Sequence, residues 1–144
     1  MLPGIFVTPT FAADIMGAGI WLAFVVAAAV VLPAAISYQN FLLENIMGVE
    51  EAFGKNGTKM TAPQRDLLSR TSDSLNTLYS ALNELKSEMD RANSLASHKK
   101  QAEAYGSIIT PLIEKLGVPC TELEGIVDNE LWPLPKFHEL LFTR

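Results

Sequence analysis

The feature that most constrains this chain is a long stretch without charge near its beginning. No charged side chain occurs from Ile15 to Leu43, and this run is longer than the about 20 apolar residues that cross a bilayer. Its most apolar part extends from Ile20 to Leu32 and ends at Pro33. A segment of this kind is stable in lipid or inside protein, because an apolar helix has no face that prefers water.

Three interpretations of this segment remain open. A membrane helix over residues 15–36 is favoured by the length and by Trp21 near one end, but no Lys or Arg precedes the run and none follows it before Lys55. A secretory signal peptide requires a basic beginning, which is absent. A helix buried in protein fits the alanine-rich turns. The missing basic flanks favour burial, or an aberrant start of the sequence, over the membrane.

The composition narrows the classes of function. Of 144 residues, 19% are charged and 49% are hydrophobic, and the formal net charge is −5. Nucleic-acid binding needs a basic face, so we expect no nucleic-acid partner. Cys120 is the single cysteine, and His98 and His138 are the only histidines. The sequence therefore offers neither a disulfide framework nor the spacing of zinc ligands.

A helix is predicted over residues 34–53, where apolar residues recur at spacings of three and four. We expect it to stop by Gly54. The following stretch, Gly54–Lys59, is predicted to be a loop, and the order of its residues does not match a phosphate-binding loop. Asn56 begins a glycosylation sequon, which matters only if this segment lies outside the cell.

The longest predicted helix covers residues 61–97. Thr61 and Gln64 form a capping-box pattern at its start, and Pro63 suits a first helical turn. An apolar stripe alternating by three and four residues follows: Leu68, Thr71, Leu75, Leu78, Leu82, Leu85, Met89, Ala92 and Ala96. A narrow stripe serves either an antiparallel hairpin within one chain or a dimeric coiled coil. We favour the hairpin.

A third helix is predicted over residues 100–116. Pro111 lies inside it, and an interior proline removes one backbone hydrogen bond, so we expect a kink near Ile108. Gly117 is a suitable stop, and Pro119 two residues later reinforces it.

The chain closes with a short acidic helix, predicted over residues 120–131, and a hydrophobic tail. A tail with this many large apolar side chains exposes an apolar patch unless it docks on something. The expected anchors of this docking are Trp132, Pro133, Pro135, Phe137, Leu141 and Phe142. The predicted fold is all-α, an antiparallel helical hairpin or bundle with an apolar N-terminal helix and an extended, docking C-terminal tail.

The side chains that carry chemistry form no recognisable catalytic site. Glu124 and Asp128 are four residues apart and are expected to share a helix face in an acidic group that also contains Glu122 and Glu130. Without a histidine or a calcium-loop glycine, a solvated acidic face is the favoured interpretation. Cys120 is placed where a helix is predicted to begin, a position that lowers the pKa of a thiol, but a lone cysteine there is more often structural or incidental, and this is the interpretation we favour. His98 is expected on the surface, and His138 has no partner for a triad.

Two segments resemble a known family. Val31–Gln39, followed by Leu42–Ile46, resembles the start of the C-terminal helical region of type III glutamine synthetases. Leu123–Phe142, with its Trp-Pro-Leu-Pro-Lys run, resembles the closing signature of the same family. The resemblance covers residues 31–144, which we take as one helical domain. Residues 1–30 do not match and represent either a membrane segment or a truncated or frame-shifted gene start.

The resemblance implies a parent enzyme that joins ammonia to glutamate with ATP and Mg²⁺ or Mn²⁺, as a cytoplasmic homododecamer. Its nucleotide, glutamate and metal residues lie on a catalytic barrel upstream, and no position here matches them. We therefore expect no catalytic, cofactor-binding or metal-ligating residue in this chain. It is expected to be a structural and oligomerisation region that contacts the catalytic domain and is inactive alone. The alternative is a membrane-anchored helical interaction protein with residues 15–36 in the bilayer.

Overall fold

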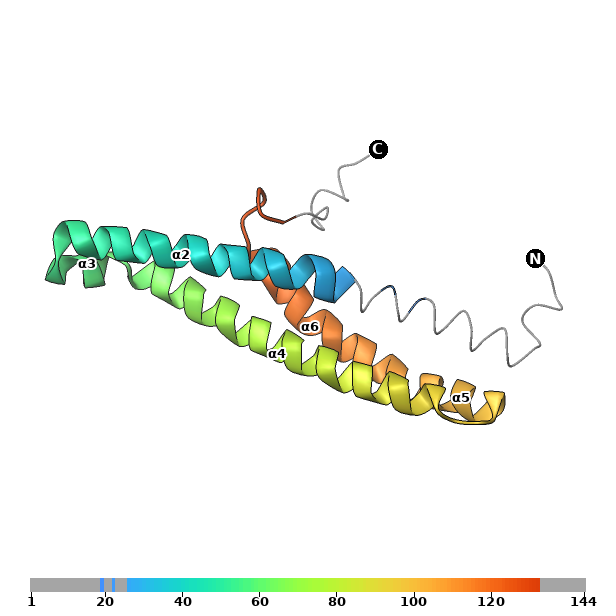
Figure 1. The fold of residues 1–144 in the computed structure, drawn as a ribbon. Helices are drawn as coiled ribbons and strands as arrows, with labels where there is room; N and C mark the ends of the chain where they lie inside the picture. Colours follow the sequence, from blue (N-terminus) through green and yellow to red (C-terminus); the bar gives the residue numbers. More distant parts are fainter. Residues whose placement is uncertain (1–18, 20–21, 23–25, 133–144) are drawn as a thin grey trace.

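The computed structural model describes Gly19, Leu22 and residues 26–132, which form helices and turns without any strand (Figure 1). The predicted all-α fold is confirmed. The elements are the π-helical turn η1 (Ala27–Val31), α2 (Leu32–Phe53), α3 (Lys55–Met60), α4 (Ala62–Asn93), α5 (His98–Ala104), the π-helical turn η2 (Tyr105–Ile109) and α6 (Thr110–Ile126).

Helix α4 is the longest helix that the structure describes, and both α2 and α6 pack against it. Its 32 residues span about 48 Å at the rise of an α-helix. Helix α2 packs antiparallel to the first part of α4, and α6 runs back along α4 from the other end, whereas α2 and α6 scarcely contact each other (Figure 1). The antiparallel hairpin predicted within one chain is therefore present twice, as α2–α4 and as α4–α6.

The core follows the apolar stripe predicted for α4. Six of its positions are buried (Thr71, Leu78, Leu82, Leu85, Met89 and Ala92), Leu68 and Leu75 are partly buried, and Ala96 lies exposed beyond the end of the helix. Ser74 and Ala81 are buried as well. These two residues widen the stripe, because α4 packs against two helices on neighbouring faces instead of one partner along a single seam.

Two prolines follow directly after π-helical turns. Pro33 lies in the first turn of α2 behind η1, and Pro111 lies in the first turn of α6 behind η2. In an α-helix the proline ring clashes with the carbonyl group four residues earlier. A π turn widens the backbone at that point, so the helix passes the proline without ending. The disturbance predicted near Ile108 thus takes the form of a π turn.

The predicted end of the first helix is confirmed, but the loop predicted after it is wrong. Helix α2 ends at Phe53, and Gly54 takes a φ of +60°, a conformation that favours glycine. The next residues form the short helix α3, which folds back onto α2. A Cβ atom at Gly57 would lie 2.6 Å from the Cα atom of Glu50. Glycine at this position therefore permits the two backbones to approach closely.

The capping box predicted at Thr61 is also wrong. Its backbone has φ −96° and ψ 10°, and its side chain makes no cap hydrogen bond to α4. The Thr61 hydroxyl donates instead to the carbonyl oxygen of Gly57, at 3.0 Å. Because α3 leads directly into α4, Thr61 continues a helical path and does not begin one from an extended residue, as a cap requires.

The third helix continues past the predicted stop at Gly117. Helix α6 includes Gly117 and Pro119 and ends at Ile126, so residues 120–126 complete α6 and no separate acidic helix spans 120–131. Pro119 is fully buried and, with Ser74 of α4, borders a small cavity. Burial against α4 outweighs the lost backbone hydrogen bond, so packing overrides the local stop signal.

Candidate functional site

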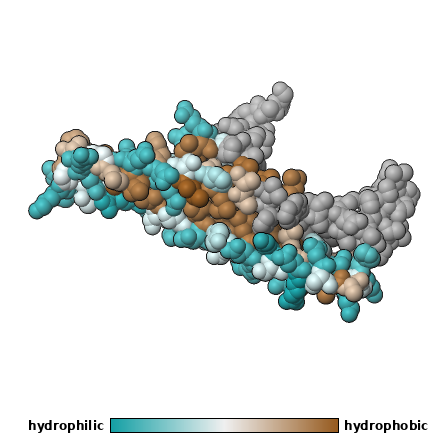
Figure 2. All heavy atoms as spheres, in the orientation of Figure 1, coloured by the Kyte–Doolittle hydropathy of each residue, from teal (hydrophilic) through white to brown (hydrophobic). Residues whose placement is uncertain are grey.

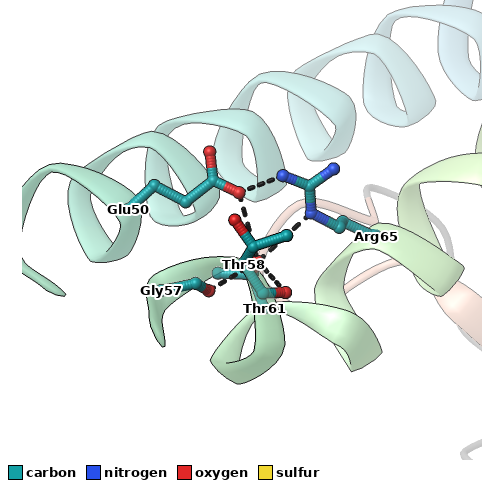
Figure 3. Close-up of polar contacts among 5 residues, drawn as sticks. All are labelled: Glu50, Gly57, Thr58, Thr61 and Arg65. Carbon is teal, nitrogen blue, oxygen red and sulfur yellow. Dashed lines mark hydrogen bonds and ion pairs between the residues drawn. The ribbon is translucent and has the colours of Figure 1, made fainter. Parts of the chain in front are cut away.

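Polar side chains gather at the corner where α2, α3 and α4 meet (Figure 3). Arg65 of α4 forms an ion pair with the carboxylate of Glu50 of α2. The Nε atom of Arg65 also donates to the Thr61 hydroxyl, at 3.2 Å. The Arg65 side chain is 48% exposed, so water screens this pair, which contributes at most about 1 kcal/mol to stability. The corner fixes the turn between the helices.

Two further hydrogen bonds set the register of α2 against α4. The side-chain amide of Gln64 donates to Asn45 Oδ1 at 3.0 Å, and that of Gln39 donates to Ser72 Oγ at 2.8 Å. Both bonds join side chains beside the apolar contact. Since a shifted pairing loses both of them, they favour one alignment of the two helices.

The acidic residues singled out in the sequence do not form a shared face. Glu124 lies in the last turns of α6, but Asp128 lies in the turn that follows the end of the helix. The carboxylate of Asp128 accepts a hydrogen bond of 2.8 Å from the backbone N–H of Glu130. Among the described residues, no three His, Cys, Asp or Glu side chains are grouped so that they could hold a metal ion.

The environment of Cys120 differs from the one expected. Cys120 lies in the middle of α6 and not at a helix start, and it is partly buried. Burial raises the pKa of its thiol, whereas a position at a helix start would lower it. His98 is exposed at the beginning of α5, as expected, whereas His138 lies outside the described residues.

The turn after α6 is closed by hydrogen bonds of its own, and two of its residues, Val127 and Trp132, are buried. The backbone N–H groups of Leu131 and Trp132 donate to the carbonyl oxygen of Asp128, at 3.1 and 3.0 Å. Tyr38 of α2 lies close enough to Asp128 for the carboxylate to affect it. Burial, and to a lesser extent the charge of Asp128, raises the pKa of the Tyr38 hydroxyl. The turn is therefore part of the packed structure.

An apolar cavity of about 520 Å³ lies beside this turn. One wall comes from Ala27 and Val31 of η1, the opposite wall from Leu116 and Cys120 of α6, and Trp132 borders it as well. We call it the Trp132 cavity. Its volume lies within the range of pockets that hold small molecules, and its walls are mainly hydrophobic.

Trp132 is the one predicted anchor of the tail that the structure describes. It is 8% exposed and belongs to the hydrophobic core. Its indole Nε1 atom is buried, and no hydrogen-bond acceptor for it is found among the described residues. The other anchors, Pro133, Pro135, Phe137, Leu141 and Phe142, lie outside those residues.

The membrane interpretation rests on a segment that the structure describes only in part. Most of residues 15–25 lie outside the described residues. The continuous helix Ala27–Phe53 is long and apolar enough to cross a membrane, with a mean hydropathy of 1.2. A third of the residues in the most apolar part of this helix is buried in the fold, and the helix packs on α4. The core helix of a globular protein has the same properties, so this is weak evidence for a membrane.

Several structural residues were missed from the sequence. Gly57 was assigned to a loop, because a glycine between two predicted helices is a turn signal, and its close contact with Glu50 arises only when α3 folds back onto α2. The pair Glu50–Arg65 joins residues of two helices, and nothing in the spacing of one helix indicates such a partner.

On the surface of the described residues, apolar residues gather over the middle of the molecule, between more hydrophilic ends (Figure 2).

Comparison with known proteins completes the description of the chain. No protein-family model matches it. Over 119 residues it is 36% identical to a glutamine synthetase of Bacteroides fragilis, and over 116 residues it is 28% identical to the type-3 glutamine synthetase of Dictyostelium discoideum. Each alignment covers 79% of this chain but only 16% of the relative. The resemblance stated from the sequence is thereby confirmed: most of this chain is similar to a limited segment of type III glutamine synthetases.

Proposed function

We propose that the chain is the C-terminal structural and oligomerisation region of a type III glutamine synthetase-like enzyme. The observation that carries this proposal is the similarity over 79% of the chain to a segment that makes up 16% of each relative. In the parent reaction, ATP-dependent ligation joins ammonia to glutamate. We assign the binding of ATP and of Mg²⁺ or Mn²⁺ to the catalytic domain of the parent enzyme, so this chain alone is inactive in our proposal.

The fold supports a structural role. The core of α4 is continuous, and two helices hold it from neighbouring sides. Polar contacts across the helices, such as Gln39 with Ser72, set the alignment of α2 on α4. A scaffold of this kind keeps its outer faces in fixed positions, which is what contact with a second domain requires.

One outer face of α2 suits contact with the catalytic domain. Ile36, Leu43 and Met47 are separated by seven and four residues, so they share a face of the helix. Their exposed fractions are 48%, 46% and 60%. Because side chains of α2 such as Leu42 are buried toward α4, the helix is apolar on two sides. We assign the exposed side to the catalytic domain of the parent enzyme, and we expect the assembly to be a cytoplasmic homo-oligomer, a dodecamer in the family.

A chimera tests this proposal. The segment of the Bacteroides fragilis enzyme that aligns with this chain is replaced by the aligned residues of the chain. We expect the chimera to assemble as the parent does and to keep glutamate- and ammonia-dependent phosphate release. The same assay on the purified chain is expected to give no activity.

Two variants of the chimera make the test specific. Leu78→Asp places a charge at a fully buried position of α4, and should abolish folding of the segment and assembly together. Ile36→Ser with Leu43→Ser and Met47→Ser alters only the exposed face and should weaken assembly while the helical content stays unchanged. Full assembly and activity in the Leu78→Asp chimera would contradict a structural role for this region.

A further inference from the structure

The neighbours Asn56 and Gly57 combine a reactive sequence with a tightly held conformation. Asn56 is exposed in the short helix α3, and no other asparagine of the sequence precedes a glycine. Asparagine is thermolabile, because the backbone nitrogen of the next residue can attack its side-chain amide. Glycine in that next position has no Cβ atom to hinder the attack, and its backbone turns freely. In an unfolded chain, Asn56 is therefore the most reactive asparagine of this sequence.

The folded chain holds Gly57 on both sides of its Cα atom. Its backbone N–H donates to the carbonyl oxygen of Gly54 at 2.9 Å. Its carbonyl oxygen accepts from the backbone N–H and from the hydroxyl of Thr61, each at 3.0 Å. Gly57 is also buried against α2, where a Cβ atom would lie 2.6 Å from the Cα atom of Glu50. Rotation of the Gly57 nitrogen toward the Asn56 side chain breaks these contacts, so α3 must first leave α2.

We propose that Asn56 is a site of spontaneous deamidation that the contact between α3 and α2 keeps closed. When α3 opens, the Gly57 nitrogen loses its proton and bonds to the Asn56 Cγ atom, and the bond from Cγ to Nδ2 breaks with release of ammonia. Water then adds to either carbonyl carbon of the resulting succinimide ring, which opens to aspartate or to isoaspartate. The reaction consumes one water molecule, releases one ammonia molecule and transfers no electrons, so it requires no further reactant.

One of the two products prevents α3 from returning to its place. Isoaspartate carries the main chain through the former side chain, which adds a methylene group between positions 56 and 57. Gly57 is then displaced from the narrow space beside Glu50, where even an added Cβ atom meets the backbone. Its carbonyl oxygen is displaced from the Thr61 hydroxyl, to which Arg65 is also bonded. The modification therefore converts a temporary opening of this corner into a permanent one.

Peptide mapping by mass spectrometry measures the reaction and separates aspartate from isoaspartate. The full chain is incubated in mildly alkaline buffer, either folded or unfolded in guanidinium chloride. We expect conversion at Asn56 to be at least about tenfold slower in the folded chain, because only the open form of α3 reacts. Asn56→Gln should give almost no product at this position, since its longer side chain must form a larger ring. Equal rates in the folded and the unfolded chain would overturn the proposal.

A matched pair of variants tests whether the corner controls the rate. Thr61→Val removes the hydroxyl that donates to the Gly57 carbonyl oxygen and leaves both reacting residues unchanged. Ser72→Ala removes the hydrogen bond with Gln39, which also joins α4 to α2 but lies outside the corner. We expect Thr61→Val to react about three- to tenfold faster than the unaltered chain, because the loss of one hydrogen bond raises the open population by that factor.

Ser72→Ala should react at the rate of the unaltered chain, and circular dichroism checks that both variants keep their helical content. Arg65→Ala removes the ion pair with Glu50 from the same corner. It should accelerate the reaction less, and it replaces Thr61→Val if that variant loses helical content. Equal rates of conversion in the corner variant and in Ser72→Ala would refute control of this site by α3.

Discussion

Truncation of Leu85 tests the central claim that α4 holds the fold together. Leu85 is completely buried, and Leu82 and Met89 lie one turn away on the same face of α4. Leu85→Ala removes three carbon atoms, which are worth about 0.8 kcal/mol each, so the transfer term is about 2.4 kcal/mol. The cavity left behind adds up to about 2 kcal/mol. We therefore expect the free energy of unfolding to fall by about 2.5–4.5 kcal/mol.

Urea denaturation followed by circular dichroism measures this loss. The matched control is Leu43→Ala, the same chemical change at a position of α2 that is 46% exposed. It should lower the free energy of unfolding by less than about 1 kcal/mol, because much of the side chain already contacts water. If Leu85→Ala and Leu43→Ala have the same effect, α4 is not packed as described and the reasoning fails.

Three further predictions concern particular contacts. Gly57→Ala should destabilise the chain by about 1–3 kcal/mol, because its new methyl group meets the α2 backbone. Gly48→Ala has open space around its Cβ position and should stabilise the chain by about 0.5–1 kcal/mol. Thermal melts of the two variants measure both effects. Arg65→Ala should cost less than about 1 kcal/mol, and salt should reduce the difference from the unaltered chain. Burial raises the pKa of the Cys120 thiol, so the unfolded chain releases this proton first. The stability should be at its full value below about pH 8.5 and decline above it, and Cys120→Ala should flatten that decline in denaturation curves taken across the alkaline range.

The helical stripes could be predicted from the sequence because periodicity reports burial directly. The apolar spacing in α4 identified Leu78, Leu82 and Leu85 as core residues, and the structure buries all three. Fold class follows from such patterns, since helices with one apolar face pack against one another. The similarity to part of the type III glutamine synthetases was likewise visible in the sequence, in residues near both ends of the helical region.

The helix ends could not be predicted as well, because they depend on contacts between distant residues. Gly117 and Pro119 are stop signals in isolation, but Pro119 is buried against α4 and the helix continues. Thr61 has the right neighbours for a cap, yet the preceding residues are helical and remove the need for one. The pKa of the Cys120 thiol depends on a helix boundary in the same way, because the length of α6 decides whether this residue lies at the start of a helix or inside one.

The shared position of α4 has a consequence for the dynamics of the chain. Because α2 and α6 scarcely contact each other and α6 meets this part of the chain mainly at η1, the part of α2 beyond Tyr38 can separate from α4 while α6 remains in place, and α6 can do so while that part of α2 stays. Such a molecule contains two cooperative units with one common member. In hydrogen exchange, amides in the middle of α4 should exchange last, and α2 and α6 should each exchange at a rate of its own. A partner that binds only α2 would then leave the separation of α6 from α4 unchanged, and a partner that binds only α6 would leave that of α2 unchanged.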